Sequence, residues 1–495
     1  MTDEAEVLVV GGGYAGLASA LFLSHQGVRC LLVDKHPDVS PLGRARGINM
    51  RTMELYRPLG LEKALLEAGR PFDSETGVVR CERLTGEWHW ILDHQTPRAL
   101  PDLTPGVFGM ADQSSVEPIL IDAARERGAA IRFGAELLSA DQDAEGVTAR
   151  ILDHASGARS TVRARYLIAA DGYRSGIRRR LGIARPGPGV TEHWISFIVD
   201  ADLSEVVTRR ALLWIVVNPE VGTGSLLTQA KPDQWVVSVT YDPARQSPAD
   251  FTPDRCAALA RAVIGADLPV RVGVITSWEQ AVGVADRFRS GRMFLVGDSA
   301  HVWPPAGAMG ANAAVQDAHN LAWKLAAVLG GRAADGLLDT YEDERRPVAS
   351  ALADLTVRRQ RARFGASLGE DDVDDVVCIL GQRYNSSAVI DPAHTTVYGG
   401  EVERDALPGT RMPHLWLDTD VSTHDLFHDA FVVLTDTDEW LRAAASVNLR
   451  AHRAPVRGCI LVRPDGYVAW RASGPVADPA AELDGALRRV LGVKP

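Results

Sequence analysis

Residues suited to binding a dinucleotide occur in three glycine-containing segments of the chain. The first, residues 11–16, reads Gly-Gly-Gly-Tyr-Ala-Gly and lies between an apolar run at 7–10 and an apolar stretch at 17–26. This order predicts a buried strand, a tight turn and a helix whose N-terminal N–H groups attract phosphate. Glycine lets the turn approach a pyrophosphate and lets the helix pack on the strand. The predicted pyrophosphate-binding residues are Gly11, Gly13 and Gly16.

Acidic residues also occur where further apolar runs, predicted to be buried strands, end. Asp34 ends the second strand and is placed to accept hydrogen bonds from ribose hydroxyls. Two further runs end in Asp171-Gly172 and Gly297-Asp298. We expect Asp171 to cap a helix or to bind a ligand, and Asp298 to accept a hydrogen bond from a ribityl hydroxyl. Three such segments in this order indicate one bound FAD.

A glycine-rich stretch at 304–312 precedes a long apolar helix predicted at 313–329. It directs a helix N-terminus, with its partial positive charge, at a flavin that gains negative charge on reduction. A loop at 40–49 contains Arg46, which we expect to contact the cofactor, and Gln113 precedes another predicted helix at a position suited to hydrogen bonding. The predicted flavin contacts in these segments are Arg46, Gln113, Pro304, Gly307, Gly310 and Asn312.

The composition is that of a soluble, cytoplasmic enzyme. The 495 residues exceed one hydrophobic core and predict two or three domains. A net charge of −11 argues against a nucleic-acid partner. The five cysteines form no CxxC pair and no zinc spacing, so we expect a reducing compartment and no metal site. Residues 7–23 are apolar, but their glycine turn fits a buried strand and helix better than a membrane span.

Together the three segments resemble the class A flavoprotein monooxygenases, the family typified by p-hydroxybenzoate hydroxylase. The match is closest at 297–301 and 316–325, whereas Ala308 and Ala314 stand where many members carry glycine. Three further segments are similar to the aromatic polyketide hydroxylases, such as aklavinone and angucycline hydroxylases. These are residues 51–55, 383–389 and 461–471. The resemblance spans nearly the whole chain.

The resemblance implies an α/β fold of three domains. A Rossmann-like FAD-binding domain takes residues 1–71, 105–186 and 282–395, and a β-sheet substrate-binding domain takes 72–104 and 187–281. A C-terminal thioredoxin-like domain that lacks the CxxC pair takes 396–495. We expect this last domain to have a structural or oligomerisation role.

Alternating apolar residues in the middle of the chain predict antiparallel strands at 194–200, 211–217 and 235–241. A sheet with one covered face suits a roof over a flat aromatic ligand, although packing in a core is the more common use of tryptophan. The candidate substrate contacts are Trp214, Trp235, Trp278 and Gln229.

The family implies an FAD-dependent monooxygenase with NADPH or NADH as a transient reductant. Reduced FAD reacts with O2 to form a C4a-hydroperoxyflavin, which hydroxylates an aromatic substrate, here expected to be a polyketide in antibiotic biosynthesis. Arg46 and Arg383 are the candidate catalytic residues. Arg46 is expected to contact the flavin or the nicotinamide, and Arg383 to polarise a substrate carbonyl or to stabilise the departing peroxide.

Two alternatives keep the same cofactor. One is an epoxidase or Baeyer–Villiger oxygenase that acts on a polyketide or an antibiotic, and the other is a non-catalytic flavoprotein that serves as a binding subunit. A metalloenzyme, a serine hydrolase and a flavin disulfide reductase are disfavoured because their motifs are missing. We expect a monomer or homodimer.

Overall fold

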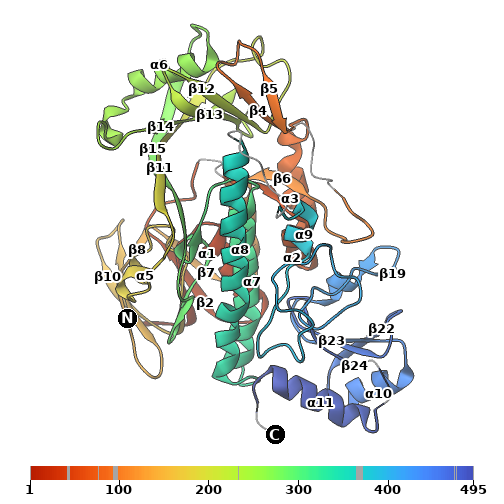
Figure 1. Cartoon of the computed structure of the whole chain (residues 1–495). Coiled ribbons are helices and arrows are strands. Elements are labelled where there is room, and N and C mark those ends of the chain that lie inside the picture. The colour runs from red at the N-terminus through yellow and green to blue at the C-terminus, as the bar shows by residue number, and fades with distance from the viewer. Residues whose placement is uncertain are drawn as a thin grey trace.

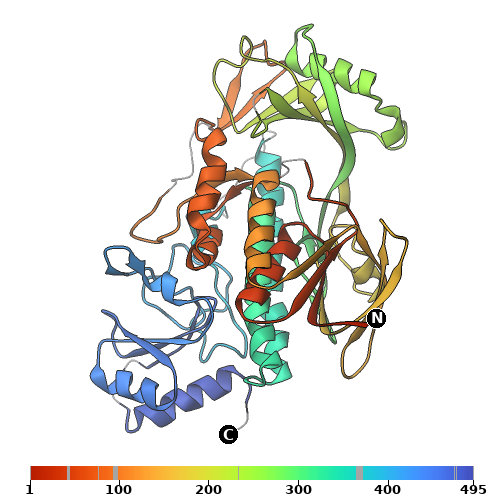
Figure 2. The same cartoon turned by 180° about the vertical axis from the view of Figure 1, so that it is seen from behind.

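The computed structural model describes residues 2–41, 45–75, 77–92, 99–231, 233–363, 372–472, 474 and 476–493. One large sheet lies beside a pair of long helices, and a second large sheet lies beyond one end of these helices (Figures 1 and 2). A smaller sheet lies in the C-terminal part. The long helices, α7 (Met309–Leu329) and α8 (Thr340–Arg363), pack against each other through the middle of the molecule.

The first sheet is built around the predicted dinucleotide-binding strand. Its parallel strands lie in the order β17, β10, β1, β2, β7. Their bounds are β1 (Thr2–Val10), β2 (Cys30–Asp34), β7 (Ala130–Phe133), β10 (Arg159–Ala169) and β17 (Met293–Leu295). The apolar residues at the centre of β1 are fully buried, as expected for a parallel sheet covered on both faces. Antiparallel strands β8 (Ala135–Gln142), β9 (Val147–Asp153) and β16 (Arg289–Ser290) extend this sheet.

Parallel strands bring the turns that follow them to one edge of a sheet. The turns after β1, β2, β10 and β17 contain the predicted motifs, so the topology gathers all of them along the carboxyl edge. Helix α1 (Tyr14–His25) follows the first turn and packs against α7 and α4 (Gln113–Glu126). The short strand β3 (Arg46–Ile48) pairs with β6 (Gly109–Asp112) nearby, followed by α2 (Met50–Tyr56) and α3 (Glu62–Gly69).

The second sheet lies in the order β18, β15, β11, β14, β13, β12, β4, β5. Its strands are β4 (Val78–Cys81), β5 (His89–Leu92), β11 (Gly189–Asp200), β12 (Leu213–Asn218), β13 (Gly222–Thr228), β14 (Gln234–Tyr241), β15 (Arg271–Val284) and β18 (His301–Val302). Helix α6 (Pro253–Ile264) covers its outer face, away from α1 and α7 (Figures 1 and 2). The opposite face is therefore the one turned toward the first sheet.

The C-terminal part holds a four-stranded sheet in the order β22, β21, β23, β24. Its strands are β21 (Val432–Thr435), β22 (Arg450–Arg453), β23 (Cys459–Val462) and β24 (Val468–Ala472), with helices α10 (Asp438–Ser446) and α11 (Pro479–Val490). A small hairpin, β19 (Trp416–Asp418) and β20 (Val421–Ser422), precedes it. Helix α9 (Asp375–Leu380) begins the segment that leads into this part.

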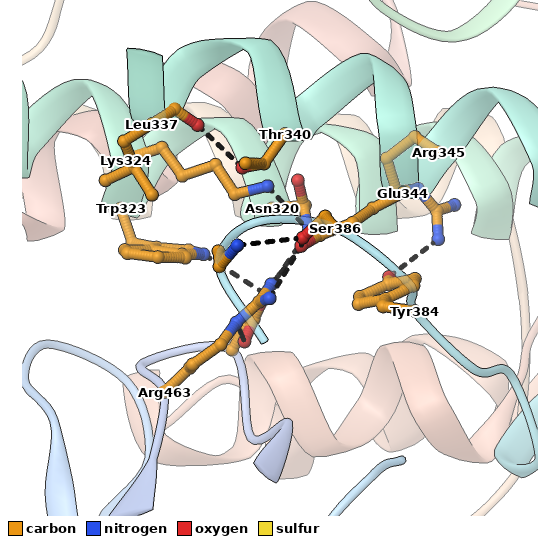
Figure 3. A network of polar contacts seen from close by, with 12 residues as sticks. Asn320, Trp323, Lys324, Leu337, Thr340, Glu344, Arg345, Tyr384, Ser386 and Arg463 are labelled. Atoms are coloured by element: carbon orange, nitrogen blue, oxygen red, sulfur yellow. Dashed lines mark hydrogen bonds and ion pairs between the residues drawn. The ribbon is translucent and has the colours of Figure 1, made fainter. Parts of the chain in front are cut away.

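A buried charge network fixes the C-terminal part against α7 and α8 (Figure 3). At its centre Glu344 of α8 accepts hydrogen bonds from Lys324 at 2.8 Å and from both terminal nitrogens of Arg463 at 2.6 and 2.8 Å. Arg463 also pairs with Asp465, and the indole N–H of Trp323 donates to the same carboxylate at 3.1 Å. All these side chains are almost completely buried. Burial opposes ionisation of Glu344, but Arg463 and Lys324 outweigh it and hold the pKa of Glu344 below its usual range.

A second carboxylate, Glu54 of α2, joins the same two parts. It pairs with Arg51 at 2.8 Å and with Arg411, which lies far along the chain, and it accepts a hydrogen bond from the hydroxyl of Thr104. Arg51 in turn donates to the backbone oxygen of Asp465 at 2.5 Å. The two carboxylates therefore belong to one continuous polar interface.

Among the described residues, no helix is both long enough and apolar enough to cross a membrane. In the same ranges, no group of histidine, cysteine and acidic side chains is arranged to hold a metal ion.

Candidate active site

The first glycine turn is shaped by close backbone packing. Gly11 has φ +112°, and a Cβ there would lie 2.2 Å from the carbonyl oxygen of Ala170. A Cβ on Gly16 would lie 1.8 Å from the carbonyl oxygen of Gly11. No larger residue fits at either position. Gly13 is the N-cap of α1 and no side chain caps that helix, so its first N–H groups are available to a phosphate.

Asp34 supports this turn from the end of β2. Its Oδ2 accepts a hydrogen bond from the backbone N–H of Gly12 at 2.6 Å, and its Oδ1 accepts one from His36 at 2.7 Å. Each carboxylate oxygen can accept a second hydrogen bond. Asp34 therefore fixes the turn and retains acceptors for ribose hydroxyls.

Asp171 lies in the turn after β10, directly beside the first glycine turn. Its Oδ2 accepts from the backbone N–H of Ile177 at 3.1 Å and holds the start of α5 (Gly176–Arg180). Its Oδ1 is buried and has no hydrogen-bond partner among the described residues. Gly172, with φ +77°, makes the turn that follows. A buried acceptor without a donor at this edge fits a site that is completed by a polar ligand.

The third turn, η4 (Gly297–Ser299), is held from two sides. Gly297 has φ +62°, and a Cβ there would lie 2.9 Å from the side chains of both Ala15 and Ala314. The hydroxyl of Ser299 donates to the carbonyl of Ala169 in β10 at 2.6 Å. Asp298 is exposed at this turn. The family departure at Ala314 thus packs directly on the turn that carries Asp298.

A buried group beneath this turn was not singled out from the sequence. Asp317 of α7 accepts from His301 and from Arg345, both at 2.7 Å, and from the backbone N–H of Gly297 at 3.3 Å. Burial disfavours the charged form of Asp317, but Arg345 and His301 outweigh it and keep its pKa below its usual range. His301 stacks on Trp303 with ring centroids 4.5 Å apart. Asp317 is the one acidic residue of α7, a helix that is mostly apolar, and this is the signal that marks it in the sequence.

The start of α7 has a strained backbone. Ala308 is its N-cap and adopts left-handed angles, φ 53° and ψ 32°, directly after Gly307 with φ +93°. Alanine in this region costs about 1–2 kcal/mol, so the departure from glycine has a structural consequence. No side chain caps α7, and its N-terminal N–H groups are available to a ligand, as at α1.

Asn312, in the first turn of α7, clamps this region. Its amide nitrogen donates to the carbonyls of Gly47 at 3.0 Å and of Ala308 at 2.9 Å, and its amide oxygen accepts from the backbone N–H of Asn49 at 3.0 Å. Both N–H groups of the Asn312 amide are therefore donated to backbone carbonyls, so its main contacts are with the protein backbone. Gly310 lies in the same turn of the helix, and a Cβ added there would lie 3.8 Å from the indole nitrogen of Trp303. Pro304 is buried just before the glycine-rich loop.

Arg46 extends from β3 into the second sheet. Its Nη1 donates to Glu75 at 2.6 Å and to the hydroxyl of Thr228 at 2.9 Å, and its Nη2 donates to the carbonyl of Thr228 at 2.5 Å. The guanidinium also lies 4.0 Å from the centre of the Phe72 ring. Its Nε is buried and has no partner within the described part of the chain. Arg46 therefore mainly bridges β3 and the second sheet, and only its Nε remains for the contact with the cofactor that the sequence predicts.

Gln113 lies on the first-sheet side of that bridge. The helix α4 begins at Gln113 itself, whereas the sequence placed Gln113 just before the helix, and Asp112 caps it. The backbone N–H of Gln113 donates to the carbonyl of Ala45 at 2.9 Å, and its side chain donates to Glu117 at 2.6 Å. Gln113 is thus next to the loop of Arg46, and its amide oxygen remains an acceptor.

Two of the predicted substrate contacts face the wrong side of the second sheet. Trp214 and Trp235 lie in the core under α6, with ring centroids 6.2 Å apart, and Trp214 is fully buried. The indole of Trp235 donates to the carbonyl of Ala201 at 3.0 Å. We correct both assignments: these tryptophans pack in a core, because successive residues of a strand point to opposite faces.

The other face of the sheet carries Trp278, together with groups that the sequence did not indicate. Trp278 stacks on Trp194 with centroids 5.4 Å apart and planes 9° apart. Its indole N–H donates to the hydroxyl of Ser196 at 2.8 Å, and that hydroxyl also bonds the hydroxyl of Ser238 at 2.7 Å. Gln229 follows Thr228, is buried, and has an amide nitrogen without a partner among the described residues. This face combines flat aromatic surface with hydrogen-bonding groups.

Arg383 lies in the segment that leads to the C-terminal part. Its backbone bridges to Thr410 and donates to Val397 at 2.9 Å, and its guanidinium packs closely on Gly399. None of these partners belongs to the turns or to the sheet face described above. We therefore do not retain Arg383 as a candidate catalytic residue.

Comparison with known proteins identifies the class. An FAD-binding-domain family model matches residues 4–356, and an aromatic-ring hydroxylase C-terminal model matches residues 405–493. The chain belongs to the FAD-dependent aromatic-ring hydroxylases of the class A flavoprotein type, which confirms the resemblance inferred from its motifs. It is a flavin-dependent monooxygenase, and FAD is its cofactor.

Particular relatives match over the full length. Tetracenomycin B2 monooxygenase-dioxygenase of Streptomyces olivaceus is 42% identical over 99% of both chains. Aklavinone 12-hydroxylase of Streptomyces purpurascens is 39% identical, also over 99% of both. The structure of aklavinone-11 hydroxylase with FAD and aklavinone superposes with a TM-score of 0.89 at 38% identity, covering 99% of this chain and 100% of that one. The flavin-dependent monooxygenase PieE, solved with FAD and substrate, gives a TM-score of 0.84 at 30% identity, with both chains fully covered.

Proposed function

We propose that this protein hydroxylates an aromatic polyketide in an antibiotic pathway, with NADPH or NADH as transient reductant and O2 as co-substrate. The observation that carries the proposal is full-length similarity to relatives named as tetracenomycin and aklavinone oxygenases. The stacked Trp194–Trp278 pair and its serine hydroxyls support it, since they offer a flat surface and hydrogen bonds to a polycyclic phenol or quinone.

The carboxyl edge of the first sheet fits FAD. Gly13 and the uncapped start of α1 would hold the pyrophosphate, and Asp34 and Asp298 would accept hydrogen bonds from sugar or ribityl hydroxyls. The partial positive charge at the uncapped start of α7 would stabilise an anionic ring. When bound, FAD takes electrons from the nicotinamide and activates O2. The protein's part is to orient the cofactor and the aromatic ring and to exclude water.

The substrate site that we propose lies between the inner face of the second sheet and the α7 N-terminus. Trp278 and Trp194 provide the stacking surface, and the unpaired amide nitrogen of Gln229 donates to a carbonyl or phenolate oxygen. Arg46 lies at the border of this site, where its free Nε is a second donor.

We also propose that the C-terminal part is thioredoxin-like. Its β21-α10-β22 unit is parallel, and β23, β24 and α11 follow as an antiparallel pair and a helix, which is the order of a thioredoxin core. Cys459 is fully buried in that sheet and burial raises the pKa of its thiol to about 12, so this part has no thiol chemistry. Its expected role is structural, in a cytoplasmic monomer or homodimer.

The test is to purify the protein, record its flavin spectrum, and measure NAD(P)H oxidation with a panel of aromatic polyketides. The expected result is a yellow protein whose NAD(P)H oxidation is stimulated by a polycyclic phenol or quinone, with one or more oxygen atoms added to an unbroken ring. Ring expansion or an epoxide product would identify the alternative oxygenases, and the absence of stimulation by any aromatic compound would identify a binding subunit. A colourless protein that takes up no FAD would overturn the proposal.

A further inference from the structure

The bridge made by Arg46 depends on a carboxylate with no assigned role. Glu75 lies in the connection between η2 (Arg70–Phe72) and β4, and its side chain is fully buried. Its Oε2 accepts from Arg46 and its Oε1 accepts from the hydroxyl of Thr228. That hydroxyl accepts in turn from Arg46 at 2.9 Å. The three side chains therefore form a closed ring of hydrogen bonds at the end of β13.

Charge makes this ring more than a packing contact. Arg46 and Glu75 are both buried, and burial favours the neutral form of each side chain. It lowers the pKa of Arg46 and raises the pKa of Glu75, and the charge of each partner opposes these shifts. Neutralising one member leaves a buried charge without its counterion, which is strongly unfavourable. Arg46 is therefore expected to leave its position when Glu75 loses its charge.

The other side of the Arg46 loop is fastened to the cofactor site. Asn312 binds the backbone of Gly47 and Asn49, the residues that follow Arg46, and also the carbonyl of Ala308 at the start of α7. Hydrogen bonds and the backbone of residues 46–49 thus connect Glu75, which lies beside the end of β13, with the N-terminus of α7. One end of this connection borders the proposed substrate surface and the other borders the proposed flavin position.

We propose that Glu75 is a positioning residue for the hydroxylation. It holds Arg46 in place, and residues 45–49 then fix the position of the second sheet relative to the N-terminus of α7. The inference rests on the proposed function for its kinetic test. It assigns Glu75 no contact with the reacting atoms. The consequence is that losing the Glu75 charge misplaces substrate relative to cofactor while the pyrophosphate turn, which is built separately by Gly11 and Gly16, stays intact.

The first test compares Glu75→Gln with Arg210→Gln. Glutamine keeps the size of Glu75, removes its charge and replaces one of its two acceptor oxygens with an NH2 donor. Arg210 is half-exposed and lies 3.9 Å from the same carboxylate. We expect Glu75→Gln to lower kcat/KM for the aromatic substrate about a hundredfold, the scale for a displacement of about 1 Å. FAD affinity should stay within about twofold, and Arg210→Gln should change both quantities by less than about twofold, within the scatter expected for a surface change.

The second test asks whether Glu75 acts through Arg46. In an Arg46→Gln background, Glu75→Gln should change kcat/KM by less than about twofold, because coupled residues are not additive. Full additivity of the two changes, or a Glu75→Gln enzyme with kcat/KM within about threefold of the parent, would overturn the proposal. If Glu75→Gln does not fold, Thr228→Val replaces it: it removes the shared hydroxyl, keeps both charges, and should lower kcat/KM in the same direction by a smaller factor.

A readout without turnover separates this inference from the proposed function. Hydrogen exchange of the FAD-loaded protein should show faster amide exchange at residues 45–49 in Glu75→Gln and no change in Arg210→Gln. This result would support the anchoring role even if no polyketide stimulated NAD(P)H oxidation. Unchanged exchange in the loop of a folded Glu75→Gln protein would refute it, whatever the substrate proves to be.

Discussion

The first sheet and its helices meet the second sheet and the C-terminal part through junctions of different kinds. Against the C-terminal part, Glu344 and Glu54 are each shared by at least two cationic side chains, so each carboxylate has several partners. Against the second sheet, one buried contact is the ring of Arg46, Glu75 and Thr228, in which Arg46 is the buried cation and the half-exposed Arg210 lies 3.9 Å from Glu75. In a network where each carboxylate has several partners, moving one side chain leaves other buried charges without a counterion. A ring of three side chains can separate without affecting other buried pairs. The first junction is therefore expected to resist local opening more than the second.

Breaking the many-partner junction should cause the largest loss of stability. Glu344→Gln leaves Lys324 and Arg463 buried without their shared anion, and we expect the free energy of unfolding to fall by about 3–5 kcal/mol. Denaturant unfolding measures this. Asp484→Asn, in the exposed pair with Arg488, is the matched control and should cost less than about 1 kcal/mol. Equal effects from the two variants would show that the buried network does not hold the junction.

Acid should also destabilise the protein through a histidine that lies beside Arg51 and Asp465 of this junction. His319 of α7 is buried, and burial lowers its pKa from 6.5 to about 3. As the pH falls, this proton binds to the unfolded state before it binds to the folded state. The contribution of neutral His319 to the free energy of unfolding is therefore present above pH 6.5 and is lost as the pH falls toward 3, at about 1.4 kcal/mol per pH unit. Between pH 6.5 and 4.5 the parent should lose about 2 kcal/mol from this group alone. A His319→Gln variant should show a shallower loss in thermal unfolding over that range, and an identical slope would contradict the assignment.

On the other side of the domain, removing the Asn312 clamp should cost less. Asn312→Ala leaves the buried N–H of Asn49 and two carbonyls without their partner, which we expect to cost about 1–3 kcal/mol. The loop of Arg46 should also become less ordered, so substrate affinity should fall more than the affinity for FAD. Titration of the variant with each ligand checks this, and a larger loss for FAD would instead favour Asn312 as a direct cofactor contact.

The smallest effect is expected at Ala308. Ala308→Gly removes the cost of left-handed alanine but adds chain entropy to the unfolded state, so the net gain should be about 0.5 kcal/mol. Thermal unfolding of the FAD-free and FAD-bound forms measures it. Ala314→Gly, which opens space against Gly297 without relieving any strain, serves as the comparison and should be destabilising. A gain of stability in both variants would rule out backbone strain as the reason.

Predictions from local sequence succeeded where one segment carries the whole constraint. The strand, glycine turn and helix around Gly11–Gly16 were predictable because backbone geometry at that turn admits only glycine. The family and its cofactor followed from three such segments in order. The tryptophans were a different case: Trp214 and Trp235 are prominent in the sequence, yet the side of the sheet that each faces depends on the pairing of neighbouring strands and on where α6 packs.

Composition, the order of strands and helices, and the three glycine turns were thus determined by the sequence read by itself, because short-range sterics and hydrophobic periodicity act within a few residues. The tertiary structure alone decided which charges meet. Arg463 finds Glu344 across 119 positions, and Glu54 finds Arg411 across 357. Burial then makes these pairs obligatory, because an ion removed from water needs its partner close by, and no local pattern specifies which partner that is.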